Sequence, residues 1–250
     1  MNRFGLVGYP LEHSFSKAYF TKKFQDMGIS DTHVYEFYEM EDISSFPAIW
    51  DDNPDLIGTN VTIPHKQNVM KFLDAIDPGA QRVGAVNTVK REGDKLVGYN
   101  SDYIGFKRSL TNWLENGKAY KCLILGTGGS AKAVQVALED LGYDFQLVSR
   151  RQDKGDFMYT KFYKDEGLFP SFDLVVNTTP IGMYPNVHDG PPIPYESMHK
   201  EQFFYDLIYN PEKTLMLTEA ERVGARIKNG AEMLVLQAER SWEIWTNHIE

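Results

Sequence analysis

Residues 121–150 read "KCLILGTGGSAKAVQVALEDLGYDFQLVSR", and this stretch decides the fold. An apolar run, a glycine-rich turn, a helical segment and a second apolar run follow one another within about 30 residues, the pattern of a strand–helix–strand unit. Two later runs, "FDLVVNTTP" at 172–180 and "FFYDLIY" at 203–209, are almost continuously apolar. Such runs are typical of parallel strands covered on both faces. The second part of the chain is therefore predicted to be a doubly wound α/β sheet.

The glycine turn in this stretch fits the dinucleotide-binding pattern G-x-G-x-x-A. Gly126 makes the turn, Gly128 lets a diphosphate approach the backbone, and Ala131 keeps helix and strand close. The helix N-terminus offers N–H groups and the positive end of its dipole to phosphates. The predicted Rossmann-type cofactor site includes the whole turn: Gly126, Thr127, Gly128, Gly129, Ser130 and Ala131. A tight turn without a ligand is the alternative.

The end of the second strand indicates which dinucleotide binds. Sites for NAD carry an acidic residue there, which holds the ribose 2′-hydroxyl. Here the chain has polar and basic residues instead: Ser149, Arg150, Arg151 and Lys154. Because guanidinium groups bind phosphate through paired hydrogen bonds, this set predicts a 2′-phosphate and therefore NADP(H). Asp153 and Asp156 weaken the prediction, since they could neutralise the turn, and a solvated basic turn is the alternative.

Strand-like and helix-like stretches alternate along the rest of the chain as well. Strands are expected at 3–9, 33–40, 56–62 and 225–230, with a hairpin at 87–100. Helices are expected at 14–28, with Ser14 as N-cap, and at 42–50, 64–76, 101–117, 211–224 and 231–248, with a turn at 77–79. We place a domain boundary near Ser101 and expect a cleft between two α/β domains. The first comprises 1–101 with the C-terminal helix 233–250, and the NADP-binding domain comprises 102–232.

Composition argues against several classes of function. The chain has 250 residues, a formal net charge of −9 and 42% hydrophobic residues. A negative chain is unsuited to non-specific nucleic-acid binding, and no apolar run approaches the roughly 18 to 20 residues of a membrane span. The single cysteine, Cys122, and six scattered histidines support neither a disulfide nor a metal site. With no secretory signal at the start, a cytoplasmic setting is expected.

The stretch "NVTIPHK" at 60–66 leads from a strand through a proline to a lysine. Pro64 suits the first turn of a helix, whose dipole would disfavour the charged form of the Lys66 ammonium. An enzyme that moves hydride needs a proton donor or acceptor at the reacting oxygen, and Lys66 is a candidate for that role. Its position alone leaves a solvated lysine at a helix start as the alternative.

Several longer motifs occur in a fixed order along nearly the whole chain, from Gly8 to Gln237. They are "GYPLEHSFS", "NVTIPHK", "GAVNTV", "GYNSDYIGF", the glycine turn, "YDLIYNP" and "NGAEMLVLQAE". Together they resemble the shikimate/quinate dehydrogenase family. The resemblance implies reversible reduction of 3-dehydroshikimate to shikimate with NADPH, a step of aromatic amino acid (chorismate) biosynthesis. The implied partner is this small molecule, and the protein is expected to be a monomer or homodimer.

The resemblance also implies roles for individual residues. Lys66 and Asp102 match the family's catalytic pair, and Ser14 and Ser16 match serines that hold the substrate carboxylate. The implied substrate-binding residues are Ser14, Ser16, Thr62, Lys66, Asn87, Asp102, Tyr209 and Gln237. Leu207 and Gly230 match positions beside the nicotinamide, where a glycine lets the ring approach the backbone. Asn177 and Thr178 end a parallel strand, where ligands gather in doubly wound sheets.

The chain departs from the family pattern at a few positions. Tyr103 and Glu232 stand where the family often has glycine, and Ser-Arg-Arg at 149–151 replaces Asn-Arg-Thr. Two alternatives stay open: a quinate/shikimate dehydrogenase that uses NAD, and a non-catalytic nucleotide-binding module. Lys66 and Asp102 favour an enzyme, and the two arginines favour NADPH.

Overall fold

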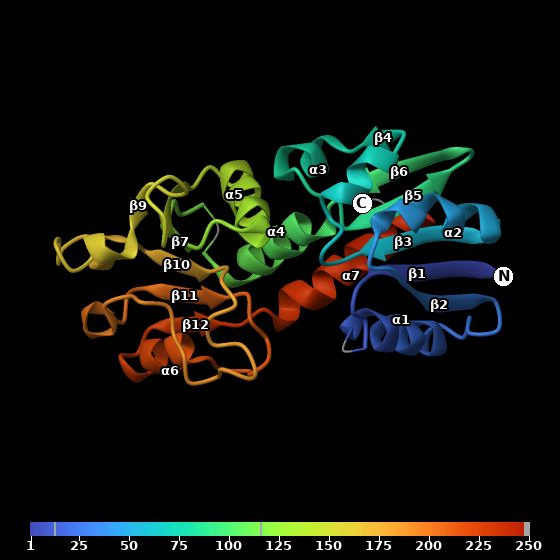
Figure 1. Ribbon diagram of the computed structural model, residues 1–250. Coiled ribbons are helices and arrows are strands. Elements are labelled where there is room, and N and C mark those ends of the chain that lie inside the picture. The colour runs from blue at the N-terminus through green and yellow to red at the C-terminus, as the bar shows by residue number, and fades with distance from the viewer. Residues whose placement is uncertain (13, 116, 248–250) are drawn as a thin grey trace. The chain divides into compact units, whose positions relative to one another are not determined.

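The computed structural model describes residues 1–12, 14–115 and 117–247 (Figure 1). The chain forms two compact units, Met1–Ser101 with Ala238–Glu250, and Asp102–Gln237. Each unit has its own six-stranded sheet with helices beside it, so the predicted α/β class is confirmed. Residues 233–237 lie in the second unit, although the sequence assigns them to the first domain. Positions 248–250, the end of the predicted last helix, fall outside the described residues.

The first unit contains a mixed sheet with strand order β2-β1-β3-β5-β6-β4. Its strands are β1 (Asn2–Gly8), β2 (His33–Glu39), β3 (Leu56–Val61), β4 (Ala75–Ile76), β5 (Thr88–Glu92) and β6 (Lys95–Tyr99). Strand β1 pairs with β2 and β3 in parallel, whereas β5 runs antiparallel to both β3 and β6. The predicted hairpin at 87–100 is therefore confirmed. The antiparallel pairing brings the end of β3 and the start of β5 to one edge of the sheet.

The helices of the first unit confirm some predictions and correct others. They are α1 (Phe15–Asp26), α2 (Phe46–Asp52) and α3 (Pro78–Val83), with 3-10 segments at Ile43–Ser45 and Asn68–Phe72. Ser14 is the N-cap of α1, as predicted, and its hydroxyl accepts a hydrogen bond from the Ser16 N–H at 3.2 Å. The predicted turn at 77–79 is wrong, because Asp77 caps the N–H groups of Gly79 and Ala80 and thereby starts α3.

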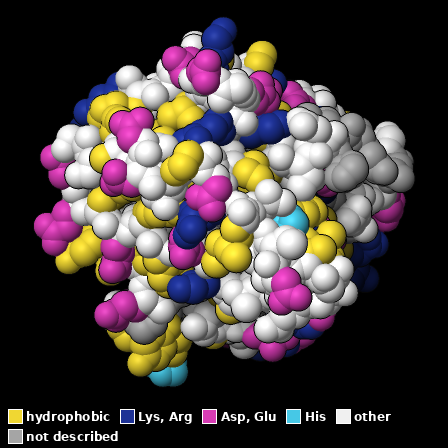
Figure 2. Space-filling model, turned by 90° about the vertical axis from the view of Figure 1, so that its right-hand side faces the viewer, with side chains coloured by type: hydrophobic (Ala, Val, Ile, Leu, Met, Phe, Trp, Pro, Cys, Tyr) yellow, Lys and Arg dark blue, Asp and Glu magenta, His cyan; other side chains and the backbone are white. Residues whose placement is uncertain are grey.

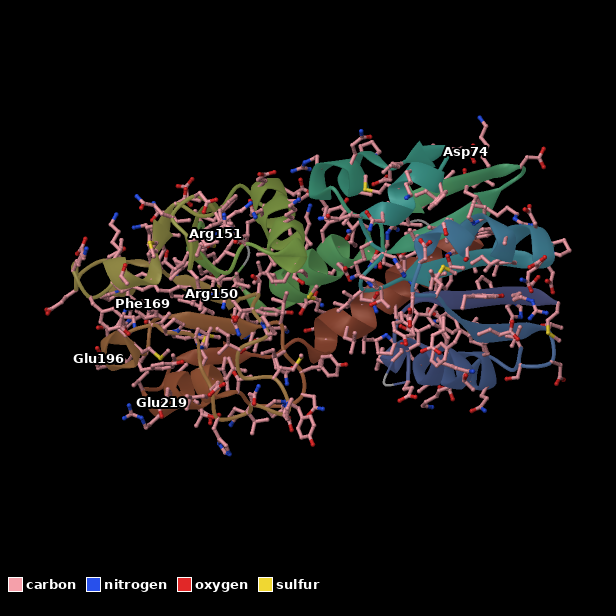
Figure 3. All side chains as sticks on the ribbon, in the orientation of Figure 1. Asp74, Arg150, Arg151, Phe169, Glu196 and Glu219 are labelled. Carbon is pink, nitrogen blue, oxygen red and sulfur yellow. The ribbon has the colours of Figure 1, made fainter. Side chains whose placement is uncertain are left out.

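The predicted helix at 64–76 is also wrong, because its backbone groups form hydrogen bonds with residues elsewhere in the unit. The Lys66 carbonyl accepts from the Val86 N–H at 2.7 Å, and the Asp74 N–H donates to the Leu96 carbonyl at 2.9 Å. The Asp74 carboxylate, labelled in Figure 3, accepts the Leu96 N–H at 2.7 Å. What forms instead is a series of turns, a short 3-10 segment and β4. The helix-dipole argument for Lys66 therefore has no structural basis.

The second unit is a fully parallel sheet with strand order β12-β11-β10-β7-β8-β9. Its strands are β7 (Lys121–Leu125), β8 (Asp144–Ser149), β9 (Phe157–Met158), β10 (Leu174–Asn177), β11 (Phe203–Asp206) and β12 (Arg226–Lys228). The helices are α4 (Ser101–Trp113), α5 (Gly129–Asp140), α6 (Leu215–Arg222) and the first part of α7 (Ala231–Thr246), which passes into the first unit at Ala238. Short 3-10 segments lie at Tyr159–Lys161, Phe169–Ser171 and Tyr195–Ser197. The predicted strand–helix–strand unit at 121–150 is confirmed.

Both faces of this parallel sheet are buried, as the apolar runs predict. Leu123 and Val175 pack in one hydrophobic cluster, whereas their neighbours Ile124 and Val176 pack in another. This alternation follows from the two-residue period of a strand. Burying each such side chain contributes about 1.5–3 kcal/mol. The sheet is therefore a rigid platform whose carboxyl edge carries the loops described below.

The end of α7 belongs to the core of the first unit. The Trp245 ring lies 5.0 Å from Phe4 and 5.3 Å from Phe20, and its indole N–H donates to the Val89 carbonyl at 3.0 Å. A Cβ on Gly58 would lie 2.8 Å from Cε2 of that indole, so only glycine leaves room for it. The C-terminal part of α7 is thus part of the core of the first unit, although it is distant in sequence.

One face of the molecule, shown in Figure 2, carries acidic and basic side chains interspersed among hydrophobic ones. Charges distributed in this way keep like charges apart. None of the helices in the described ranges combines the length and apolar character that crossing a membrane requires.

Candidate functional site

The second unit has a pocket of about 450 Å³ at the carboxyl edge of its sheet. Seven of the predicted cofactor residues line it: Gly126, Thr127, Gly128, Ser149, Arg150, Arg151 and Thr178. Lys154, noted in the sequence beside the arginines, lines it as well. The wall also includes four residues that the sequence did not indicate: Tyr159, Thr179, Pro180 and Ile181. The pocket therefore brings together the glycine turn, the basic strand end and the loop after β10.

The glycines of the turn serve different purposes. Gly126 has a φ of +102°, and a Cβ there would lie 2.8 Å from Cγ2 of Thr179, so the protein itself requires glycine at this position. A Cβ on Gly128 or Gly129 would meet no described atom within 4 Å. Gly128 is the N-cap of α5 and provides no side-chain cap, so the first N–H groups of this helix face the turn uncapped. That arrangement suits a diphosphate.

The two arginines at the end of β8, both labelled in Figure 3, differ in their partners. Arg151 donates to both oxygens of Asp153, at 3.0 and 2.7 Å, and this pairing holds the pKa of Asp153 below its usual range. The neutralisation considered from the sequence therefore applies to Arg151. Arg150 has no carboxylate partner in the part of the chain that the structure describes, and it lines the pocket. Arg150 is thus the better placed of the two to bind a phosphate.

Three other predicted cofactor residues, Asn177, Leu207 and Gly230, contact the protein's own groups near the carboxyl edge of the sheet and do not line the pocket. Asn177 is fully buried, donates to the Asp206 carboxylate at 3.0 Å and accepts from the Thr179 N–H and hydroxyl. A Cβ on Gly230 would overlap the Leu207 carbonyl oxygen and lie 2.6 Å from its carbon. The close approach at Gly230 is therefore to the protein's own backbone. Gly129, Ser130 and Ala131, together with Asn177, Leu207 and Gly230, are not part of the pocket wall described above.

Asp206 was not predicted from the sequence, yet it organises this edge. It is fully buried at the end of β11 and accepts hydrogen bonds from Ile208 N–H at 3.0 Å and the Thr214 hydroxyl at 2.7 Å, besides that from Asn177. Burial raises the pKa of Asp206 to about 6, although these three hydrogen bonds oppose the shift. An apolar run around a lone aspartate, as in "FFYDLIY", is the signal that could have identified it.

The predicted substrate residues of the first unit occupy one edge of its sheet. Thr62 follows β3, and its N–H donates to the Val7 carbonyl at 2.9 Å. Lys66 lies in the following turns and is half-buried. Asn87 precedes β5, and its carbonyl accepts the Val61 N–H at 2.9 Å. Because β1 and β3 are parallel, the α1 N-terminus with Ser14 and Ser16 follows the same carboxyl edge.

A buried polar network that the sequence did not reveal holds Asn87. Its amide donates to the Ser101 hydroxyl at 3.0 Å and accepts the Ser101 N–H at 2.7 Å. Ser241 of α7 lies 2.8 Å from the Asn60 amide nitrogen, 2.9 Å from the Thr88 hydroxyl and 3.1 Å from that of Ser101. All five side chains are buried. Such a satisfied network fixes side-chain orientation, as recognition of a hydroxyl-rich ligand requires.

The remaining predicted substrate residues belong to the second unit. Asp102 is in the first turn of α4, as predicted. Tyr209 is 44% exposed, and Gln237 in α7 donates to the Leu234 carbonyl at 2.9 Å.

Glu232, one of the departures from the family pattern, is neutralised within the second unit. It accepts from Asn112 at 2.8 Å and pairs with Lys228. Burial acts to raise the pKa of Glu232, but hydrogen bonds from Asn112 and Lys228 hold it below its usual range. The carboxylate therefore connects α4 with the start of α7 and adds little unbalanced charge.

A parallel sheet with a glycine turn, an uncapped helix and a basic strand end defines the second unit as a dinucleotide-binding α/β domain of the Rossmann type. Residues 6–89 match the family model described as "Shikimate dehydrogenase substrate binding domain". A shikimate dehydrogenase (NADP(+)) from Methanococcus aeolicus is 36% identical over 261 residues, which cover 97% of this chain and 91% of the relative. The chain belongs to the shikimate dehydrogenase family.

Solved structures agree with this assignment. Shikimate 5-dehydrogenase from Thermus thermophilus in complex with NADP(H) and shikimate superposes with a TM-score of 0.84 at 29% identity, covering 99% of this chain and 94% of that one. Quinate dehydrogenase from Corynebacterium glutamicum in complex with NAD superposes with a TM-score of 0.87 at 26% identity, covering 98% and 93%. The fold alone therefore does not separate the two substrates or the two cofactors.

Proposed function

We propose that the protein catalyses the NADPH-dependent, reversible reduction of 3-dehydroshikimate to shikimate in aromatic amino acid (chorismate) biosynthesis. The observation that carries the proposal is the pocket in which the glycine turn meets Arg150 and Lys154, with no acidic residue at the strand end. Relatives that are named shikimate dehydrogenase (NADP(+)) support it over nearly the whole chain.

The first unit supplies the substrate-binding domain in this proposal. Ser14 and Ser16 bind the substrate carboxylate at the start of α1, where the helix dipole also favours an anion. Thr62 and Asn87 hydrogen-bond the ring hydroxyls, and the network around Ser101 and Ser241 keeps Asn87 in place. Tyr209 and Gln237 complete the set. Dense polar pairing of this kind discriminates strongly, because an analogue that lacks a hydroxyl leaves buried groups unpaired.

Lys66 and Asp102 are the proposed catalytic pair. The nicotinamide, when bound, supplies the hydride. The Lys66 ammonium hydrogen-bonds the substrate oxygen and transfers its proton as the ketone becomes an alcohol. The Asp102 carboxylate orients that ammonium toward the substrate oxygen. The residues of the pocket would hold the cofactor, and Leu207 and Gly230 match the family positions that would lie beside its nicotinamide.

The Lys66→Met variant tests the catalytic assignment. Loss of general acid–base catalysis is expected to lower kcat by a factor of about 10²–10⁴ with little change in cofactor binding. Lys71→Met, which removes an exposed lysine five positions further on, is the matched control and should leave turnover unchanged. Undiminished kcat in Lys66→Met would remove this residue from the mechanism.

A quinate dehydrogenase that uses NAD is the second candidate, favoured by the similarity to the Corynebacterium glutamicum enzyme. Absorbance of the reduced nicotinamide, with shikimate and quinate each offered against NADP and NAD, separates the two. Preference for shikimate with NADP supports the main proposal, and preference for quinate with NAD contradicts it. Cofactor binding without any turnover would indicate a nucleotide-binding module instead.

The protein is proposed to act in the cytoplasm on a small-molecule substrate, as a monomer or homodimer. Within residues 1–12, 14–115 and 117–247, no group of three or more His, Cys, Asp or Glu side chains is arranged to hold a metal ion. The proposed chemistry uses the lysine and the carboxylate for proton handling.

A further inference from the structure

The hydroxyl of Tyr159 is an unsatisfied polar group in the wall of the nucleotide pocket. The side chain is only 7% exposed, and its oxygen is buried without a hydrogen-bond partner among the described residues. Buried polar groups almost always have a partner, and one left unpaired lowers the stability of the fold. Because Tyr159 also lines the pocket, a ligand bound there is the obvious source of the missing partner.

The local topology explains how Tyr159 reaches the pocket. Parallel strands are usually joined by a crossover of a dozen or more residues, but β8 and β9 are joined by residues 150–156 alone. Asp156 secures this short link, because its N–H donates to the Leu147 carbonyl at 2.9 Å and its carboxylate accepts the Leu147 N–H at 2.6 Å. In the resulting register Ser149 pairs with Met158. Tyr159 therefore follows at the same strand end as Arg150.

The charges around Tyr159 indicate what kind of group it would bind. Arg150 and Lys154 share the pocket wall with it, whereas Arg151 is engaged by Asp153. Burial raises the pKa of Tyr159 to about 12, with the Arg150 charge acting in the opposite direction. The phenol is therefore protonated at neutral pH and can donate its hydrogen. A neutral donor that shares a pocket wall with two cations suits an anionic, oxygen-rich group such as a phosphate.

We propose that Tyr159 is a specificity-determining residue that donates a hydrogen bond from its hydroxyl to the 2′-phosphate of NADP(H), alongside Arg150. This inference rests on the proposed use of NADP(H). It adds a neutral donor from the end of β9 to the basic strand end that the sequence indicates. Without the phosphate the hydroxyl has no hydrogen-bond partner in the described part of the chain. This one unpaired group therefore both lowers the stability of the ligand-free protein and favours NADP(H) over NAD.

The test is the Tyr159→Phe variant of the full chain, measured in two ways. Titration calorimetry with 2′,5′-ADP and with 5′-ADP reports binding with and without the 2′-phosphate. Loss of one hydrogen bond to a charged group should weaken 2′,5′-ADP about tenfold and leave 5′-ADP unchanged. Thermal unfolding of the ligand-free variant should occur at an equal or higher temperature, because an unpaired buried hydroxyl has been removed. In steady-state assays the KM for NADPH should rise while kcat stays constant.

Tyr163→Phe is the matched control, since Tyr163 is 62% exposed and four positions away. It should change neither binding nor stability. Unchanged 2′,5′-ADP affinity in Tyr159→Phe would overturn the proposal. Equal weakening of both ligands with a lower unfolding temperature would also overturn it, by assigning the hydroxyl a structural role. If the unaltered protein fails to prefer 2′,5′-ADP over 5′-ADP, the cofactor assignment itself is wrong.

Discussion

The nucleotide edge of the second sheet and the polar edge of the first sheet are built in different ways. The nucleotide edge takes its turn and basic group from one continuous stretch, residues 121–150, and adds a few residues that follow β9 and β10. The polar edge of the first unit is assembled from the ends of β1 and β3, the start of β5 and, through Ser241, the last helix. A phosphate site can be encoded locally because one strand–turn–helix presents most of its donors. A site for a polyol needs donors from several directions, and only a folded sheet brings these together.

The largest expected loss of stability comes from a substitution at Gly230, whose backbone packs against the strand end of the nucleotide edge. In Gly230→Ala the new Cβ overlaps the Leu207 carbonyl, so the backbone must move, and the free energy of unfolding should fall by about 3–4 kcal/mol. Urea denaturation measures this change.

Gly128→Ala is the matched control for Gly230→Ala, because its Cβ meets no described atom within 4 Å. It should leave stability within about 1 kcal/mol of the unaltered protein while weakening NADPH binding. Equal losses of stability in both variants would contradict the distinction between a glycine required by the fold and one that leaves room for the ligand.

Asp206 is expected to make the free energy of unfolding depend on pH. Its pKa is raised from 3.8 to about 6, so the folded state retains a proton that the unfolded state has released. Stability from this group is complete below pH 3.8 and is lost as the pH rises through 6, with a total of about 3 kcal/mol at 1.36 kcal/mol per pKa unit. Asp206→Asn should lose this part of the pH dependence.

Unfolding free energies at pH 4 and pH 7 check the role of Asp206. The stability at pH 4 relative to that at pH 7 should be about 2 kcal/mol lower in Asp206→Asn than in the unaltered protein, because pH 4 already lies just above the unfolded pKa of 3.8. An identical pH profile in both proteins would show that Asp206 does not titrate with a raised pKa.

Ser241→Ala tests the polar edge of the first unit. It removes the hydroxyl bonded to Asn60, Thr88 and Ser101, so buried groups are left unpaired and stability should fall by about 2 kcal/mol. The KM for shikimate should rise as well, because Asn87 is bonded to Ser101.

Thr246→Ala, in the same helix, is the control for Ser241→Ala, since Thr246 is half-buried and its hydroxyl donates to the Trp242 carbonyl within the helix. Calorimetric unfolding and steady-state kinetics provide the two measurements. A Ser241→Ala protein with unaltered stability and KM would mean that the network does not position Asn87.

The smallest effect separates the two arginines. Arg151 is engaged by Asp153 on the surface, so Arg151→Ala should raise the KM for NADPH less than about threefold, whereas Arg150→Ala should raise it by about tenfold or more. Initial-rate kinetics with NADPH and NADH distinguish the two variants. Larger losses in Arg151→Ala than in Arg150→Ala would reverse the assignment.

The outcome for "NVTIPHK" shows where sequence reasoning stops. The strand predicted at 56–62 is confirmed and ends before Pro64, but the helix predicted after this proline does not form. The His65 ring hydrogen-bonds the Met40 carbonyl at 2.7 Å, and the Lys66 carbonyl is taken by Val86, which is distant in the sequence. Local propensity cannot anticipate partners that only the folded sheet supplies. The opposite holds at Asp77, where the sequence predicts a turn and the carboxylate instead caps the start of α3.

By itself, the sequence determined the α/β class, the strand–turn–helix at 121–150, the cap at Ser14 and the basic strand end, because each depends on hydrogen bonds and periodicity within a short stretch. The tertiary structure alone decided that Tyr159 and Thr179 join the nucleotide pocket, that Asp153 engages one arginine rather than the other, and that Ser241 reaches Asn60 across the chain. These contacts arise from strand register and long-range packing, which bring together residues that no local pattern connects.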